Sequence, residues 1–552
     1  MKTISQHSET SMCGDIATLS LLLLLLLGLS DVLVVATNVD LITSCSKSRP
    51  SCLLYNITDS YEDPLKVSSF TALAGLQELV IRNSALRRIP KDLLEHAPHL
   101  KRLLMHNCGL NILTSRDFDS SQGLKVLNLQ QNSIFTLTEN VFRALRQTLE
   151  ELYLRHNAIR ILHYRAFAGL QKLKYLDANH NGINSLTAGM FDELINLEYM
   201  DLSYNQIEMI GSGTFGKNLK LSSIILSNNK FRVFEPNSFS HLPHLKLLDL
   251  SNTNLEDLHL QTVDFLQLSE SGLKSCHLAG GVVRLMAANN SLKGLDITDK
   301  LSVQEIQMQG NLLESLDDFQ GMLNLQKLDV SHNRLTRLKS SVEKFFYMEL
   351  PNLEQLNMAW NHLRNLSNQD FLIMTKLSTL DLGNNHLFEL AIESLEPLKS
   401  LHYLHIEGNH LMEFDVVNLK KSHALLQEIS LGNNDWDEAY QQNISAKLQE
   451  QQIKALKERS SGATLNASLS KEVVLQIPLS SQYGEMQRLV GVSGIHPYWT
   501  LKDILALATL IIVLIILLLQ FWNILQEEQC CRRSANRNAG DAEPLVHNNS
   551  AF

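Results

Sequence analysis

One pattern recurs along most of this 552-residue chain and constrains its fold more than any other feature. The template LxxLxLxxNxL fits sixteen times, and the first seven intervals between starts are 24 or 25 residues. A unit of this size cannot bury its own apolar face, so neighbouring units must stack around one continuous core. The repeat therefore predicts a solenoid. The starts are Leu76, Leu100, Leu124, Leu149, Leu173, Leu197, Leu221, Leu245, Val263, Val282, Val303, Leu325, Leu353, Leu377, Leu401 and Leu426.

Each part of the template has a physical role. Alternation around positions four and six predicts a short strand with one buried face. The Asn at position nine, as in Asn132 and Asn205, can bond backbone groups of the turn in unit after unit. A Phe that recurs 18 residues after the start should fill the core beneath the convex side. Its members are Phe118, Phe142, Phe167, Phe191, Phe215, Phe239 and Phe371.

Residues 76–440 resemble the leucine-rich-repeat family through this template. The resemblance implies an α/β solenoid, a horseshoe with a parallel β-sheet on its concave face, whose surface usually binds macromolecules. From Leu245 to Leu325 the intervals shrink to 18, 19, 21 and 22 residues and the Phe lapses. Shorter units need less room on the convex side, so we expect the curvature to change there.

Two apolar runs predict the compartment. Residues 19–29 suit the core of a signal peptide covering residues 1–36, with an uncleaved signal anchor as the alternative. Residues 504–519 carry no charge, and they predict a transmembrane helix over 501–522. Arg532 and Arg533 follow this run, which places its C-terminal side in the cytosol. The chain is thus predicted to be a single-pass type I plasma-membrane protein with extracellular repeats.

The segments that flank the repeats predict caps. Cys45 and Cys52 lie within an N-terminal cap at 37–75, where a disulfide would close the open edge of the solenoid. Cys108 and Cys276 are predicted to be buried thiols. After the repeats, a stalk at 441–500 begins with a helical pattern over 439–458, either a helix that caps the last repeat or a dimer contact.

Modification motifs fit this topology. Sequons predict N-glycosylation at Asn56, Asn289, Asn365, Asn443 and Asn466. Asn289 is placed at the end of a concave strand in the irregular middle, where a glycan would separate the face into two binding surfaces. In the cytoplasmic tail, 523–552, Cys530 and Cys531 suit palmitoylation. The last three residues, SAF, match a weak PDZ-domain ligand.

Outward-facing template positions (three, five, seven and eight) carry two clusters that we expect to face solvent and bind a partner. The alternative is that such ladders of Asp and Tyr only solvate the sheet. The first cluster consists of Tyr153, Arg155, His156, Tyr175, Asp177, His180, Tyr199, Asp201 and Tyr204. The second consists of Trp360, Asp381, Tyr403, His405 and Glu407.

Signals for catalysis are poor. A net charge of −10 gives no reason to expect a nucleic-acid partner. The segment GSGTFG at 211–216 matches GxGxxG, but Phe215 within it is a spine residue and no crossover helix follows. The His residues include no metal-ligand set. We therefore predict no enzyme, no metal and no cofactor.

The segment NDWD at 434–437, followed by a helix-prone stretch, resembles insect leucine-rich-repeat immune proteins, particularly mosquito membrane-anchored members. That resemblance implies innate immunity and, for secreted members, a cysteine-linked dimer that partners complement-like proteins. The cysteine pattern after Trp436 is absent here, so the covalent dimer does not carry over. The predicted function is a cell-surface receptor for a protein or microbial ligand that acts with a co-receptor or as a homodimer. The alternative is a cell-adhesion molecule.

Overall fold

A computed structural model describes residues 51–55, 57, 73–90, 93–232, 234, 238–338, 347–417 and 419–456. All of them belong to one compact unit, Met1–Ser460. Within the described residues, no helix is long and apolar enough to cross a membrane. The predicted signal peptide, transmembrane segment and cytoplasmic tail lie outside the described residues, and so do Cys45, Asn56, Asn466, Cys530 and Cys531.

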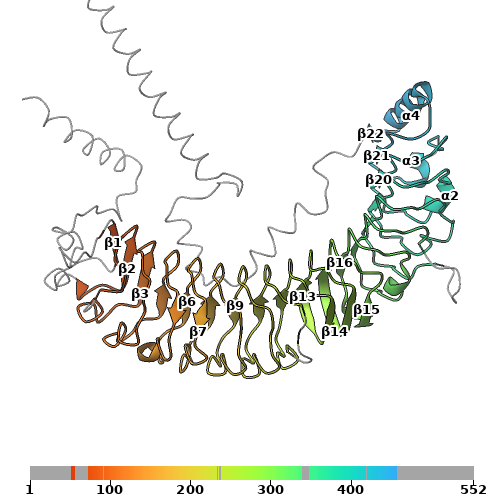
Figure 1. Cartoon of the computed structure of the whole chain (residues 1–552). Coiled ribbons are helices and arrows are strands. Elements are labelled where there is room, and N and C mark those ends of the chain that lie inside the picture. Colours follow the sequence, from red (N-terminus) through yellow and green to blue (C-terminus); the bar gives the residue numbers. More distant parts are fainter. Residues whose placement is uncertain are drawn as a thin grey trace, which may run out of the picture. The chain divides into compact units, whose positions relative to one another are not determined.

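Each of the sixteen predicted units contributes one strand to a single parallel sheet on the concave side of this unit (Figure 1). The parallel solenoid is thereby confirmed. The strands are β2 (Glu78–Arg82), β3 (Arg102–His106), β4 (Val126–Asn128), β6 (Glu151–Tyr153), β8 (Tyr175–Asp177), β9 (Tyr199–Asp201), β10 (Ser223–Ile225), β11 (Leu247–Asp249), β13 (Val263–Gln267), β14 (Ser275–Met286), β16 (Glu305–Gln307), β17 (Lys327–Asp329), β18 (Gln355–Asn357), β19 (Thr379–Asp381), β20 (Tyr403–His405) and β21 (Glu428–Ser430).

Two further strands extend the sheet beyond the repeats. β1 (Ser51–Tyr55) pairs in parallel with β2, and β22 (Lys454–Leu456) pairs in parallel with β21. Between β21 and β22, the helix α4 (Glu438–Glu450) buries Ile444 and Leu448 in the solenoid core. The predicted helix over 439–458 is thus too long, because its last part pairs with the sheet. This packing is what the capping interpretation of the helix expects.

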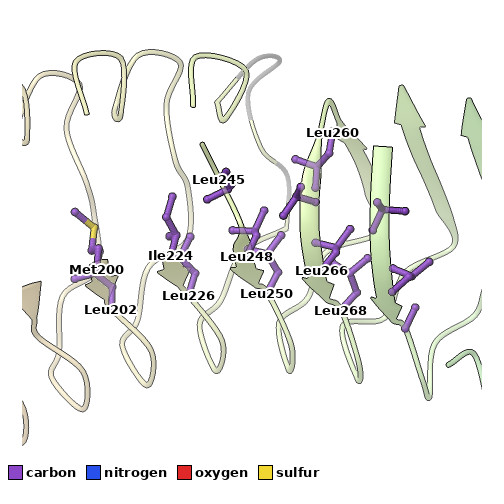
Figure 2. Packing of buried hydrophobic residues seen from close by; sticks show 14 of the residues in the cluster. Met200, Leu202, Ile224, Leu226, Leu245, Leu248, Leu250, Leu260, Leu266 and Leu268 are labelled. Atoms are coloured by element: carbon purple, nitrogen blue, oxygen red, sulfur yellow. The ribbon is translucent and has the colours of Figure 1, made fainter. Parts of the chain in front are cut away.

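Side chains at positions four and six of each unit form the core. Figure 2 shows pairs such as Met200 with Leu202 and Leu248 with Leu250 pointing inward from successive strands. Beneath the convex side, the spine rings from Phe118 to Phe239 contact one another in a continuous row, with centroids 6.0 Å apart for Phe191 and Phe215. Every predicted spine Phe is buried, so this prediction is confirmed.

The position-nine asparagines clamp neighbouring units together. The Asn205 amide donates to the carbonyls of Leu202 and, one unit earlier, Ala178, while its Oδ1 accepts from the Ile183 N–H. Asn290 and Asn311 do the same in the irregular middle, which the sequence reading overlooked. The predicted role of these asparagines is confirmed.

The short units in the middle differ on their convex side. There β12 (Asp257–Leu260), the first half of β14 and β15 (Asp296–Asp299) pair in parallel. The backs and the fronts of these units are therefore both held at hydrogen-bonded strand spacing. The remaining short elements are β5 (Thr136–Leu137), β7 (Ile161–Leu162), α2 (Ile392–Leu395), α3 (Leu419–Ser422), and the 3-10 turns at Arg143–Leu145, Lys300–Ser302 and Asp317–Phe319.

The described cysteines and sequons are compatible with their predicted roles. Cys108 and Cys276 are free and buried, as predicted. Cys52 is disulfide-bonded, and its pairing with Cys45 stays a prediction because Cys45 lies outside the described residues. The sequon asparagines within the described part are exposed, namely Asn289, Asn365 and Asn443. Their glycosylation stays a prediction.

Candidate ligand-binding face

The first predicted cluster lies on three consecutive strands of the concave sheet, β6, β8 and β9. Register pairs Tyr153 with Asp177, and Tyr175 with Tyr199. Adjacent parallel strands are about 4.8 Å apart, so flat rings on them can lie face to face. The Tyr175 and Tyr199 rings are stacked with centroids 4.4 Å apart, and Tyr153 packs diagonally on Tyr175 at 4.9 Å. The three rings form one continuous aromatic surface.

Two carboxylates lie beside this surface. Asp201 accepts hydrogen bonds from the Ser203 hydroxyl (2.7 Å) and the Asn179 side-chain amide (2.9 Å). Asp177 accepts a backbone N–H bond from Asn179 at 3.2 Å. Burial, and secondarily the charge of Asp201, raises the pKa of Asp177 to about 7. Burial also raises the pKa of Tyr175 and of Tyr199, so both phenols stay neutral.

A second aromatic row follows the strand ends at template position eight. The His156 and His180 rings have centroids 4.2 Å apart, and His180 and Tyr204 have centroids 4.1 Å apart. Burial lowers the pKa of His156 and of His180, which favours neutral imidazoles in the stack. His180 Nδ1 lies 3.0 Å from Asn179 Oδ1, and the Asn179 amide donates to Asp201. Asn179 therefore connects the position-eight row with the carboxylates beside the tyrosine rings.

Position eight has a left-handed backbone in every unit. Asn or Gly occupies most of these positions, as at Asn228, Asn252 and Gly310. Asn tolerates this conformation and Gly adopts it at no steric cost, whereas a bulky side chain is strained there. Tyr204 (φ 53°) and Trp360 (φ 57°) are nevertheless found at such positions. The local backbone therefore disfavours these two aromatic residues. Each stacks on the histidine of the preceding unit, His180 or His332, and remains about half exposed.

The expectation that the whole first cluster faces solvent is wrong. Tyr153 is only 5% exposed, and Asp177 and Asp201 are also buried, whereas Tyr204 is 50% exposed. All point to the concave side, but rings on adjacent strands cover one another and the carboxylates next to them. Tyr175, Tyr199, Arg155 and His180 are half-buried and His156 is exposed.

The second cluster divides into two arrangements. Asp381, His405 and Glu407 are buried, contrary to the expectation that they face solvent, because polar bonds between units enclose them. His405 Nδ1 lies 2.8 Å from Ser430 Oγ, which donates to Glu407. Trp360 is exposed and stacks on His332 at 5.4 Å, and Tyr403 is exposed as well.

The sequence reading missed an apolar band beside the tyrosines. Outward positions three and five carry Ile225, Leu247, Phe265 and Met286 on β10, β11, β13 and β14. Three of them are half-buried, and Phe265 is 9% exposed. The sequence did contain a signal for this band: these template positions are polar in other units and apolar here. The band continues the concave face from the tyrosines into the short units of the middle.

Family models described as leucine-rich repeats match this chain in six places. Five overlapping matches cover residues 122–183, 147–207, 179–231, 195–255 and 219–277, and the sixth covers 324–345. Leucine-rich repeat-containing protein 3B of Bos taurus and Homo sapiens is 32% identical over 98 residues, which span 18% of this chain and 37% of that protein.

Solved structures are similar at the level of the fold. The Toll–Spatzle complex of Drosophila matches with a TM-score of 0.61 and 21% identity, over 70% of this chain and 54% of that one. The TLR13–ssRNA13 complex gives 0.54 and 23%, over 74% and 58%. The LRIM1/APL1C complex gives 0.51 and 18%, over 90% and 81%. Together with the sheet and the template, these matches establish a leucine-rich-repeat solenoid.

Proposed function

We propose that this leucine-rich-repeat chain is a cell-surface recognition receptor of innate immunity that binds a protein or microbial ligand on its concave face. The binding surface comprises the tyrosine stack of β6, β8 and β9 and the adjoining row His156, His180 and Tyr204. The observation that carries the proposal is the exposed Tyr204 ring on a left-handed backbone position, where Asn is the less strained choice.

Several features favour recognition. Within the stack, Tyr175 and Tyr199 are half-buried, and the side chains that they offer are ordered before binding, so a partner has little conformational entropy to remove. Aromatic residues and Arg are the side chains that most often dominate binding at protein interfaces. The first cluster supplies both, because Arg155 lies directly beside the rings: its Nε donates to Gln130 Oε1 and its charge acts on Asp177.

The similar structures support a partner for such a face without identifying it. Their titles describe Toll with Spatzle, TLR13 with a single-stranded RNA, and LRIM1 with APL1C. The acidic groups at the tyrosine stack and the net charge of −10 favour a protein or a neutral glycan surface over RNA. We also propose a type I membrane topology, on the apolar run at 501–522, and output through a co-receptor.

The test uses cells that display the full chain, incubated with labelled microbial cells and with labelled proteins of body fluid. Tyr204→Asn should reduce the captured ligand several-fold while surface display is unchanged. Tyr164→Asn is the matched control, since it removes a tyrosine ring that is 55% exposed but lies in the turn after β7, outside the concave strands. Equal capture by the wild type and Tyr204→Asn would contradict the proposed face. Aggregation of cells that express only this chain would favour the cell-adhesion alternative over the receptor function.

A further inference from the structure

Beside the tyrosine stack, the first units carry a row of cationic and polar side chains at template position seven. We name Arg82, His106, Gln130 and Arg155 the basic row. Arg82 and His106 are paired in register at the ends of β2 and β3. The backbone ladder continues past the strands, because Asn107 N–H donates to the Gln130 carbonyl and Gln131 N–H donates to the Arg155 carbonyl. The four residues therefore follow one another across four adjacent units.

The middle of the basic row contains an unsatisfied polar group. His106 is 8% exposed, and its Nε2 is buried with no hydrogen-bond partner. The Nε of Arg82 is likewise buried and without a partner. Buried polar groups in folded proteins are nearly always paired, so two adjacent exceptions on a face that points outward require an explanation. A bound acceptor would satisfy the Arg82 Nε–H and the Nε2–H tautomer of the neutral His106 imidazole.

The charges around His106 indicate that this acceptor is negatively charged. Burial, then the charges of Arg82 and Arg155, lowers the pKa of His106 to about 4, which shows that both guanidinium groups act on this imidazole. Arg82 is in none of the ion pairs formed among the described residues, and the neighbouring Glu78 is bonded to Arg102 at 2.7 Å. The row therefore has positive charge together with unused donor capacity.

We propose that the basic row binds a carboxylate of an acidic segment in the protein partner, an inference that rests on the proposed function. The guanidinium of Arg82 matches the two oxygens of a carboxylate, and the neutral His106 imidazole, in its Nε2–H tautomer, adds a donor between the two arginines. Gln130 Oε1 accepts from Arg155 Nε at 2.5 Å, which holds that guanidinium along the row.

A protein carboxylate fits better than a long polyanion. From the unit of Arg155 onward the concave strands carry carboxyl groups, Glu151 on β6 and the buried Asp177 and Asp201 on the next two strands. A nucleic acid or sulfated glycan that followed the groove would run from cations onto these carboxyl groups. A folded protein can instead place one acidic segment on the basic row and apolar or polar groups on the tyrosines.

The test measures binding of a fluorescent octapeptide of alternating Glu and Ser to the purified full chain. Arg82→Gln and Arg155→Gln should each weaken binding about tenfold, the size expected for loss of a charge-assisted hydrogen bond. Arg82→Lys should recover part of the affinity, because it restores the charge without the planar fork. Arg116→Gln, which removes an exposed arginine from a convex turn, is the matched control and should bind as the wild type does. Unfolding midpoints of all variants report whether the fold is intact.

Three results would overturn the inference. The wild-type chain could fail to bind the peptide, or Arg82→Gln could bind it as well as Arg116→Gln does. A heparin oligosaccharide or an oligouridylate could also bind more tightly than the peptide and depend on Arg82, which would assign the row to polyanions. If the arginine variants leave peptide binding unchanged while Tyr204→Asn abolishes ligand capture, the proposed function stands and this inference fails. If the arginine variants weaken peptide binding while Tyr204→Asn leaves ligand capture unchanged, the anion site stands and the proposed tyrosine face fails.

Discussion

The rings of Tyr175 and Tyr199 lie parallel on neighbouring strands, with centroids 4.4 Å apart and an interplanar angle of 1°. This stack joins two units whose matching residues are 24 positions apart, so the spacing of the repeat determines the spacing of the rings. Because each ring restricts its neighbour, the aromatic surface is ordered before any partner arrives. Asp177 and Asp201 are buried beside the rings as a consequence.

Replacing Tyr204 by Asn should separate binding from stability. Asn tolerates the left-handed backbone at this position, so the free energy of unfolding should be unchanged or rise by up to about 1 kcal/mol. Loss of the half-exposed ring should weaken ligand binding by about 2 kcal/mol, as for an interface hot spot. Denaturant unfolding and ligand binding on the same preparations measure both. A clear loss of stability would show that Tyr204 serves the fold.

Replacing Asp177 by Asn should change how stability depends on pH. The pKa of Asp177 is about 7 in the fold and about 4 in an unfolded chain, so the folded state holds a proton that the unfolded state releases. Stability should therefore fall as pH rises from about 4 to about 7, by up to about 1.4 kcal/mol per pH unit.

The Asp177→Asn variant lacks this penalty. It should be more stable than the wild type at pH 8, and the difference should vanish toward pH 4.5, as followed by urea unfolding at each pH. Asp264→Asn, at an exposed position, is the control and should track the wild type throughout. A constant difference between Asp177→Asn and the wild type at all pH values would contradict the titration.

Replacing Asn205 by Ala should destabilise the solenoid strongly. Its side chain is buried and bonds Ala178, Leu202 and Ile183, so the variant leaves several backbone groups unsatisfied. Each such group costs about 1–3 kcal/mol, which predicts a total loss of about 3 kcal/mol or more. Asn196→Ala is the comparison, since Asn196 donates one exposed bond to the Gln171 carbonyl, and it should cost under about 1 kcal/mol. Similar unfolding midpoints for the two variants would refute the clamp.

Replacing Phe215 by Ala should open a cavity in the spine. The ring is 1% exposed and lies between Phe191 and Phe239 at centroid distances of 6.0 and 5.8 Å. The expected loss of unfolding free energy is about 3–5 kcal/mol. Phe135→Ala should cost much less, because Phe135 is 44% exposed. Chemical denaturation of both variants measures the difference, and a mild effect at Phe215 would argue against a continuous spine.

Asn289 is predicted to carry a glycan. Its side chain is exposed on a left-handed turn after β14, where the glycosylation machinery can reach it. Peptide mapping with and without glycosidase should show conversion of Asn289 to Asp after enzymatic release. Ser291→Ala removes the sequon without altering the turn residue and should abolish the conversion. An unmodified Asn289 peptide from the wild type would contradict the prediction that a glycan divides the concave face into two binding surfaces.

The sequence by itself determined the parts of this protein that repeat. Leu76 to Leu426 marked one strand per unit, Asn205 and its equivalents marked the clamps, and Phe215 and its equivalents marked the spine. These predictions succeeded because each unit of a solenoid contacts only its neighbours, so the periodicity in the chain is the periodicity of the contacts. The direction of Tyr175 and Asp177 toward the concave face followed from the same alternation.

Only the tertiary structure decided how much of each outward side chain a partner can reach. Alternation gives the face on which Tyr153 or Asp177 lies, but burial depends on the ring that the next strand places over it. The strands β1 and β22 were also missed, because a single strand at an edge has no period, and pairing with an open sheet edge defines it. The convex strands β12 and β15 arose for a related reason: short units bring their backs close enough to exchange hydrogen bonds, and that distance exists only after the units stack.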